Sequence, residues 1–233
     1  MKSRNSWIMG IGGVVFFALL ILGYSQETMA GEKSVSSQEA PIGYNDNFYG
    51  VSFVNPQKGW VVGYYGLIAH TEDGGKTWIR QNCGTQDPLL SVDFVDENHG
   101  WIVGKFAKIF HTADGGKNYS AQRSEVEEDL FDVSFVDSQN GWIVGTYGTI
   151  LHTSDGGKTW ERQGEEVDKI YNAVYFVDQS RGWIAGEFAT ILHTEDGGVH
   201  WEEQKVPLGT GYSLFDIHFS NKDTGVAVGM DGA

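Results

Sequence analysis

Four histidines are the residues of this chain whose type and spacing first suggest chemistry, because histidine is a common metal ligand. They follow one another at intervals of 41 residues: His70, His111, His152 and His193. Equal spacing places each ring at the same point of a separate repeated unit, so the four rings would not converge within about 2 Å of one ion. We therefore expect no metal site. Each histidine is expected to be a scaffold residue that forms a hydrogen bond across its own unit.

Two further patterns resemble chemical sites but lack necessary parts. Gly-Gly-Lys-Thr at residues 74–77 and 156–159 is similar to part of a phosphate-binding loop. That loop needs another glycine where His70 and His152 stand, and it needs a following helix. Cys83 is the single cysteine, so it cannot form an internal disulfide, and no His/Asn constellation accompanies it. The sequence thus predicts neither a cofactor nor a cysteine nucleophile.

The same 41-residue interval recurs in a Gly-Trp motif, at Trp60, Trp101, Trp142 and Trp183. A period of this size indicates stacked supersecondary units, none of which buries its apolar face alone. The third copy shows four short segments of strand-like composition separated by glycine-rich turns, at residues 133–136, 141–145, 149–153 and 160–163. The many glycines exclude a two-helix repeat.

A unit of four strands and 41 residues has the size of a β-propeller blade. We expect an all-β propeller over residues 46–233, with four full blades and a partial fifth that contains strands near 215–219 and 225–229. Because the pattern stops within this fifth unit, either residues 44–49 supply missing strand pairing or the chain is a fragment of a larger propeller. We favour the fragment.

Short connections between the second and third strands are expected at residues 63–66, 104–107, 145–148 and 186–189. An aromatic residue recurs in each, which predicts a packed side chain, at Tyr65, Phe106, Tyr147 and Phe188. The residue before it changes chemistry from copy to copy, which predicts a solvent-facing position, at Tyr64, Lys105, Thr146 and Glu187.

The turn between the third and fourth strands carries the strongest signature, Thr-x-Asp-Gly-Gly followed by an aromatic residue. We expect the aspartate to accept hydrogen bonds from backbone N–H groups two residues on, the glycines to supply positive φ, and the ring to hold the turn on the blade. These structural residues are Asp73 and Trp78, Asp114 and Tyr119, Asp155 and Trp160, and Asp196 and Trp201.

This turn resembles the Asp-box, or BNR repeat, of the propeller superfamily that includes sialidases. The whole blade, with Val-x-Phe, Gly-Trp-x-Val-Gly and Ile-Leu-His-Thr-x-Asp-Gly-Gly-Lys-Thr-Trp, more closely resembles the photosystem II assembly and stability factor family and its non-photosynthetic bacterial relatives. The resemblance covers about residues 46–233. It implies a propeller of usually seven blades, which would leave roughly a hundred residues outside this chain. It also implies a non-catalytic, chaperone-like role on a subunit of a membrane complex.

The alternative is a sialidase-like exported protein that binds or hydrolyses glycans. Such a site needs clustered arginines, a Tyr nucleophile activated by a Glu, and an Asp acid/base. The four arginines beyond residue 30 are instead expected on outer strands or in loops, at Arg80, Arg123, Arg162 and Arg181. We therefore predict a protein without enzymatic activity. A structural module of a larger envelope protein is the third alternative.

The first 30 residues are typical of an export signal. Lys2 and Arg4 precede an uncharged run over residues 7–24, and residues 28–30 form a small-residue cleavage site. An uncleaved N-terminal anchor is the alternative, and residues 31–45 form a polar linker. We expect the protein outside the cytoplasm: periplasmic, lumenal or extracellular.

The charge balance restricts the partners. Without Lys2, Arg4 and Glu27 the chain keeps 14 basic and 30 acidic residues, a net charge of −16. Nucleic acids and anionic membrane surfaces are therefore poor partners, and a protein partner is expected. Loops entering each first strand carry apolar residues that either anchor the strand or bind that partner: Leu89, Leu90, Leu130, Phe131, Ile170 and Tyr171.

Overall fold

The computed structural model describes residues 3–4, 42–43, 46–207, 209 and 211–230. Each 41-residue repeat forms one antiparallel sheet whose strands pair in sequence order. The four full sheets are β2 (Phe48–Phe53), β3 (Gly59–Gly63), β4 (Ile68–Thr71) and β5 (Ile79–Gln81); β6 (Leu89–Phe94), β7 (Gly100–Gly104), β8 (Ile109–Thr112) and β9 (Ser120–Gln122); β10 (Leu130–Phe135), β11 (Gly141–Gly145), β12 (Ile150–Thr153) and β13 (Glu161–Arg162); and β14 (Tyr171–Phe176), β15 (Gly182–Gly186), β16 (Ile191–Thr194) and β17 (Glu202–Glu203). β18 (Leu214–Asn221) pairs with β19 (Thr224–Gly229) in the partial fifth sheet.

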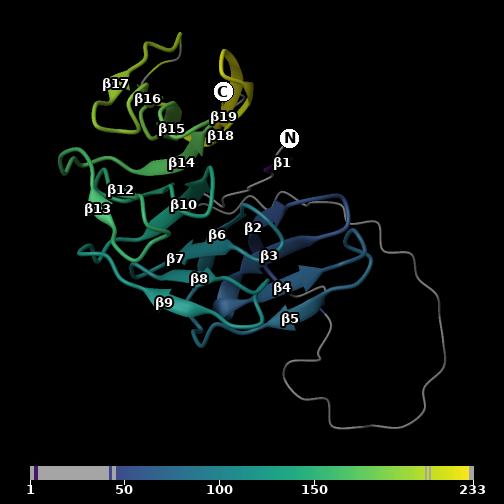
Figure 1. Cartoon of the computed structure of the whole chain (residues 1–233). Coiled ribbons are helices and arrows are strands. Elements are labelled where there is room, and N and C mark those ends of the chain that lie inside the picture. Colours follow the sequence, from purple (N-terminus) through teal and green to yellow (C-terminus); the bar gives the residue numbers. More distant parts are fainter. Residues whose placement is uncertain (1–2, 5–41, 44–45, 208, 210, 231–233) are drawn as a thin grey trace, which may run out of the picture.

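These sheets are the blades of a propeller, so the predicted all-β fold is confirmed. Figure 1 shows them following one another along the chain, from blue at β2 to yellow at β19. The first strands β2, β6, β10, β14 and β18 pack each against the next, and the fourth strands lie at the outer edge. The one helix within the described ranges is the 3-10 turn η1 (Tyr64–Gly66).

One short segment near the N-terminus pairs in a way that the repeat pattern does not predict. β1 (Ser3–Arg4) pairs antiparallel with β2. Of residues 44–49, Phe48 and Tyr49 begin β2, so in the described part this segment belongs to the first blade and does not pair with β18 or β19. The predicted signal, linker and cleavage site fall mainly on residues 5–41, outside the described residues. Within the described ranges, no helix is long and apolar enough to cross a membrane.

The second strand of each blade is buried along its whole length, which explains its Gly-Trp-x-Val-Gly sequence. At Gly100 an added Cβ would lie 2.5 Å from the ring of Phe94, and at Gly104 it would collide with the carbonyl oxygen of Pro88. Only glycine fits at both ends of this strand, because the neighbouring strand and its ring approach so closely.

The tryptophan of this strand joins each blade to the following one. Trp101 stacks on Phe135 of the next blade, with ring centroids 3.6 Å apart and planes 7° from parallel. Its indole Nε1 also donates a hydrogen bond to the carbonyl oxygen of Gly156, at 3.2 Å. The same stack recurs at every junction, in the pairs Trp60–Phe94, Trp142–Phe176 and Trp183–Phe219. The apolar core is therefore continuous from blade to blade.

The other side of each tryptophan faces the repeated histidine of its own blade. Trp101 and His111 are cross-strand partners, and their ring centroids lie 4.8 Å apart. Trp60–His70, Trp142–His152 and Trp183–His193 repeat this contact. The sequence predicts that each histidine forms a hydrogen bond across its blade. That prediction is wrong, because each histidine instead contacts the tryptophan of the neighbouring strand through its ring. Burial lowers the pKa values of His70, His111 and His152, which favours their neutral form.

The stack predicts a large loss of stability when its tryptophan is removed. We expect Trp101→Ala to lower the free energy of unfolding by about 3–5 kcal/mol, because the stack and the indole hydrogen bond are both lost and a cavity remains between two blades. Urea unfolding followed by circular dichroism measures this change. Val199→Ala, at a position 71% exposed, is the control and should change stability by less than about 0.5 kcal/mol. Equal effects of the two substitutions would contradict the role of the stack.

Candidate functional site

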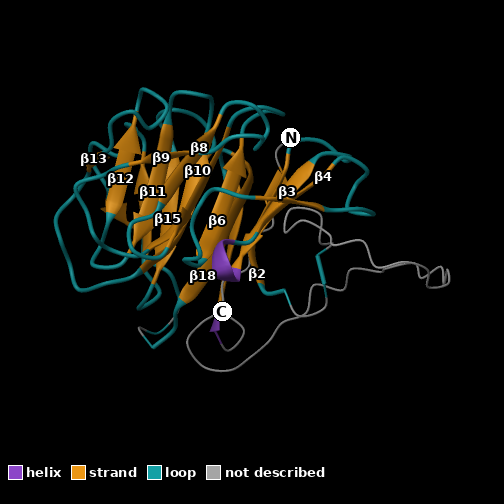
Figure 2. Ribbon diagram, turned by 90° about the horizontal axis from the view of Figure 1, so that it is seen from below, coloured by secondary structure: helices purple, strands orange, loops and turns teal. Residues whose placement is uncertain are grey.

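The loops of the propeller gather at the two ends of the strands (Figure 2). At one end are the turns between second and third strands, called tips here, at residues 64–66, 105–107, 146–148 and 187–189. Backbone hydrogen bonds join them to the lead-in loops before the first strands, at residues 85–88, 126–129, 167–170 and 211–213: Lys105 N donates to Pro88 O at 3.0 Å, and Ala107 N donates to Glu128 O at 3.0 Å. We call this end the tip face.

The aromatic residues of the tips project into solvent. The expectation that they are packed is wrong, since Tyr65, Phe106, Tyr147 and Phe188 are 73%, 66%, 54% and 53% exposed. Each has a positive φ, between 52° and 58°, because the connection turns within three residues. This left-handed conformation costs roughly 1–3 kcal/mol for a residue other than glycine. Packing does not account for a bulky ring at these positions, so the rings are available to contact another molecule.

Lys105, Lys108 and Arg162 of the tip face are held in ion pairs, whereas exposed Arg123, two residues before Glu125, is in no ion pair with other described residues. Lys105 Nζ lies 2.6 Å from Asp129, Lys108 Nζ lies 3.2 Å from Asp87, and Arg162 lies 3.8 Å from Glu128. Five exposed acids in the lead-in loops or one or two residues before them form no ion pair with other described residues: Glu125, Glu127, Glu165, Glu166 and Asp168. The net field of this end of the molecule is therefore negative.

The predicted partner-binding residues divide into two groups by burial. Leu89, Leu130 and Tyr171 begin the first strands and are buried in the core. Leu90, Phe131 and Ile170 are half-buried beside the tips, and the ammonium of Lys105 lies 5.4 Å from the centre of the Phe131 ring. The second group lies where a molecule bound on the tip face would reach it.

The Asp-Gly-Gly turns occupy the opposite end of the strands. Asp155 accepts a hydrogen bond from the backbone N–H of Thr159 at 2.9 Å and another from its hydroxyl at 2.7 Å. The sequence predicts a bond to the backbone two residues after the aspartate, but the bonded N–H belongs to the fourth residue after it. The hydroxyl of Thr153 accepts a hydrogen bond from Gly157 N. Asp73, Asp114 and Asp196 make the corresponding bonds. Both carboxylate oxygens of each aspartate thus have partners within its own turn.

The aromatic residue after each turn packs inside the blade. Trp160 meets Phe135 edge to face with centroids 5.9 Å apart, and Trp78 and Trp201 meet Phe53 and Phe176 in the same way. Tyr119 replaces this indole in the second blade and donates its hydroxyl to Gln81 Oε1 at 2.9 Å. The three tryptophans hold the turn against the first strand of their own blade, and Tyr119 connects its turn to β5 of the preceding blade.

Buried polar residues between the first strands are missing from the sequence prediction. Asp93 is fully buried and accepts a hydrogen bond from the backbone N–H of Phe135 in the next blade, at 2.7 Å. Asp132 accepts from Val174 N at 2.9 Å and from Ser91 Oγ at 2.6 Å. The signal available in the sequence is a polar residue at two repeat positions of an otherwise apolar strand, at Ser52, Asp93 and Ser134 and at Ser91 and Asp132.

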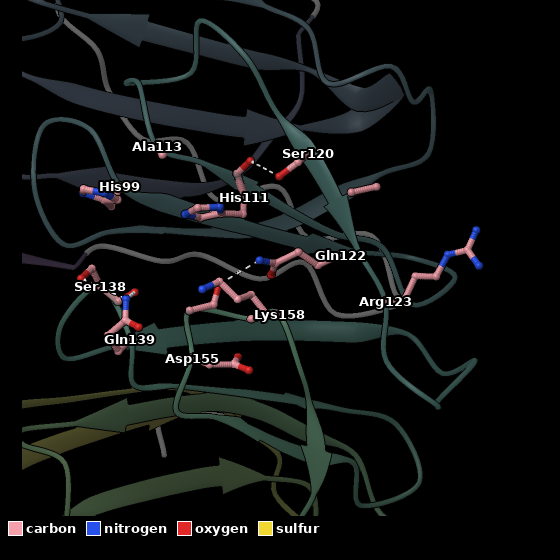
Figure 3. Close-up of a pocket in the computed structure, with 13 residues that line it drawn as sticks. His99, His111, Ala113, Ser120, Gln122, Arg123, Ser138, Gln139, Asp155 and Lys158 are labelled. Carbon is pink, nitrogen blue, oxygen red and sulfur yellow. Dashed lines mark hydrogen bonds between the residues drawn. The ribbon is translucent and has the colours of Figure 1, made fainter.

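A surface hollow of about 470 Å³ lies between the second and third blades (Figure 3). His111 lines it but stacks on Trp101, and Gln122 donates to Gly156 O at 2.8 Å. Arg123 points away from the hollow in Figure 3. Among the described residues, no three His, Cys, Asp or Glu side chains gather in a way that could hold a metal. The lining is thus built from scaffold contacts.

The arginines of the propeller lie apart from one another. Arg80 in β5 pairs with Asp46 at 2.6 Å, and Arg181 pairs with Glu195 at 3.7 Å. Arg162 lies in β13, and Arg123 follows β9. Within the described ranges they occupy separate blades or turns, so they do not form the carboxylate-binding cluster that the glycosidase alternative requires.

Comparison with protein families gives one match. The sequence model described as photosynthesis system II assembly factor YCF48 matches residues 29–123, 120–210 and 163–233. No curated protein sequence matches the chain.

Solved structures share the fold at low identity. YCF48 bound to D1 peptide is 18% identical, with a TM-score of 0.52, over 86% of this chain and 97% of that one. An ancestral GH74 enzyme is 13% identical, with a TM-score of 0.61, over 77% of this chain and 28% of the enzyme. The GH74 enzyme of Niastella koreensis is 15% identical, with a TM-score of 0.53, over 64% of this chain and 28% of the enzyme. At these identities the likeness establishes the fold alone.

The Asp-Gly-Gly turns predict that the protein loses stability in acid. The backbone N–H of Thr159 is the main cause that lowers the pKa of Asp155 to about 2, and Asp73 and Asp196 also reach about 2. A lowered folded-state pKa stabilises the fold above the ordinary value of 3.8, and this contribution is lost as the pH falls toward 2. We expect the urea midpoint to fall between pH 5 and about pH 3.

Asp155→Asn tests whether this turn is responsible. The variant should show a smaller fall of the urea midpoint than the parent, because its side chain does not titrate. Glu166→Gln, on an exposed loop, should keep the parent's dependence on pH. An unchanged pH dependence in Asp155→Asn would contradict the assignment.

The buried carboxylate between blades two and three gives a second stability prediction. Asp93→Ala leaves the N–H of Phe135 without its acceptor and should cost about 1–3 kcal/mol. Asp93→Ser is the matched variant and should cost less, because Ser52 and Ser134 accept the equivalent N–H groups of Phe94 and Phe176 at 3.1 and 3.3 Å. Urea unfolding of both variants measures the two losses of stability. A serine variant as unstable as the alanine variant would show that serine cannot replace Asp93 as the acceptor of the Phe135 N–H.

Proposed function

The chain belongs to the photosynthesis system II assembly factor YCF48 family, and on that premise we propose that it is a non-catalytic propeller that binds a segment of another protein during assembly of a membrane or envelope complex. The observation that carries the proposal is the extent of the family match, whose three overlapping segments together span residues 29–233. The family character therefore belongs to the propeller as a whole and not to one blade.

Peptide binding is supported by a protein of the same fold. YCF48 has been solved bound to D1 peptide, so a propeller of this kind accepts a peptide. We extend peptide binding to this chain, and we leave the identity of the client to experiment. A client in a membrane or envelope complex agrees with the export signal that the first 30 residues predict.

The absence of catalysis is proposed from the roles of the candidate residues. The histidines stack on tryptophans, the aspartates of the turns bind their own backbone, and Arg80, Arg162 and Arg181 form ion pairs in separate parts of the fold. Burial raises the pKa of the Cys83 thiol, which disfavours the nucleophilic thiolate. These histidines, aspartates and paired arginines thus have structural roles.

Affinity purification of the full-length tagged chain from its own membrane extract tests this function. We expect one subunit of a membrane complex to co-purify in near-stoichiometric amount and to be identified by mass spectrometry. An identically tagged, unrelated exported protein controls for adhesion to the resin. Recovery of the bait alone, with and without a cross-linker, would overturn the proposal. Recovery of the chain from the cytoplasmic fraction would overturn its export.

A further inference from the structure

The exposed aromatic residues of the described part all lie on the tip face: Tyr64, Tyr65, Phe106, Tyr147 and Phe188. Val167, 38% exposed, lies in a lead-in loop of the same face. Met230, which follows β19 and donates its N–H to Ser213 O, also lies on this face, and the large exposed apolar residues elsewhere in the described part are aliphatic: Ile79, Val199, Val226 and Val228. Aromatic rings gathered at one end of a molecule are typical of a protein-binding surface.

Hydrogen bonds fix the order of the rings and the acidic loops. Asp129 lies between two tips, because its carboxylate accepts from Phe106 N at 3.0 Å and its backbone oxygen accepts from Thr146 N at 3.1 Å. The end of the loop that carries Glu125 and Glu127 therefore lies between the tip of Phe106 and the tip of Tyr147.

The next loop continues this alternation. Gly148 N donates to Lys169 O at 2.8 Å, and Glu187 N donates to Ile170 O at 3.0 Å. Residues 165–169, with Glu165, Glu166 and Asp168, thus lie between the tip that carries Tyr147 and the tip that carries Phe188. We call this series the acidic–aromatic row: Phe106, residues 125–129, Tyr147, residues 165–169 and Phe188.

From this arrangement we propose that the acidic–aromatic row binds an extended protein segment rich in arginine and lysine. The proposal rests on the proposed function, and it names the site and the chemistry of the partner. The exposed rings offer faces to guanidinium and ammonium groups and to their aliphatic stems. The five carboxylates without ion pairs accept charge-assisted hydrogen bonds from the same groups.

The charges of the row select this occupant over others. Lys105, Arg162 and Lys169 are already paired with Asp129, Glu128 and Glu203, so within the row no described cation is left without an ion pair for an acidic segment. An anionic membrane surface or a second copy of this chain, whose net charge is −15, would be repelled. A basic segment is the partner whose charge complements the face.

Binding of a labelled peptide by the full chain tests the row. The probe is a short fluorescein-labelled peptide of alternating arginine and leucine, measured by fluorescence anisotropy, beside a peptide of alternating glutamate and leucine. We expect the arginine peptide to bind, with an affinity that falls as salt rises, and the glutamate peptide not to bind. Equal binding of the two peptides, or no binding of either, overturns the proposal.

Substitution of the rings separates recognition from general attraction between opposite charges. The double variant Phe106→Ala, Tyr147→Ala should bind the arginine peptide at least about ten-fold more weakly. Its net charge is unchanged, so attraction between charges alone predicts no loss. Alanine stands in a left-handed conformation at Ala107 and Ala189, so the tips accept it. Ile79→Ala and Val199→Ala remove exposed apolar side chains elsewhere and should bind as the parent does.

Substitution of the acids tests the other half of the row. The combined variant Glu125→Gln, Glu127→Gln, Glu165→Gln, Glu166→Gln and Asp168→Asn should bind more weakly at low salt and should lose most of the salt dependence. Affinities of the ring variant and the acid variant that both stay within about two-fold of the parent would overturn the proposal.

The co-purification experiment distinguishes failure of this inference from failure of the proposed function. If the ring variant recovers the same client as the parent, the protein-binding function stands and the row is not its site. If neither recovers a client, the proposed function fails, and the peptide measurements still decide whether the row recognises basic segments.

Discussion

The stack of each tryptophan on the phenylalanine of the following blade is the contact on which the rest of the structure depends. Val103 and Ile109 of one blade share a core cluster with Leu130 and Phe135 of the next, so no blade completes its core by itself. Stability then depends on the junctions between neighbours, as in other repeat proteins. The buried acceptors Asp93 and Asp132 act across the same junctions, where the first strands of neighbouring blades pack together.

The repeat period allowed much of this fold to be predicted, because equal spacing fixes which residues are equivalent. The second strand of the third blade, Gly141–Gly145, has the predicted bounds, whereas its first strand begins at Leu130, three residues before the predicted start. Equivalence does not reveal where a side chain points. The tip aromatics illustrate this limit, since a positive φ at Phe106 turns a ring outward that its recurrence suggested was packed.

Side-chain contacts within and between blades were the other limit. The stacking of His111 on Trp101 depends on a strand register that the spacing alone does not specify. The acceptor role of Asp93 depends on the distance between two sheets. The roles of the two ends of the propeller therefore depend on the three-dimensional structure. At one end, aspartates such as Asp155 bind the backbone of their own turns. At the other end, aromatic rings are exposed beside charged loops whose sequence changes from blade to blade.

The blade junction has a direction, because one blade always gives the tryptophan and the next always receives it on a phenylalanine. The centroid distance varies only between 3.5 and 3.6 Å over the junctions, so every blade presents the same pair of complementary sides. Duplication of one 41-residue coding unit would insert a blade whose two neighbours already fit it. Such a propeller can change length during evolution without inventing a new interface, while selection alters the loops of each copy independently.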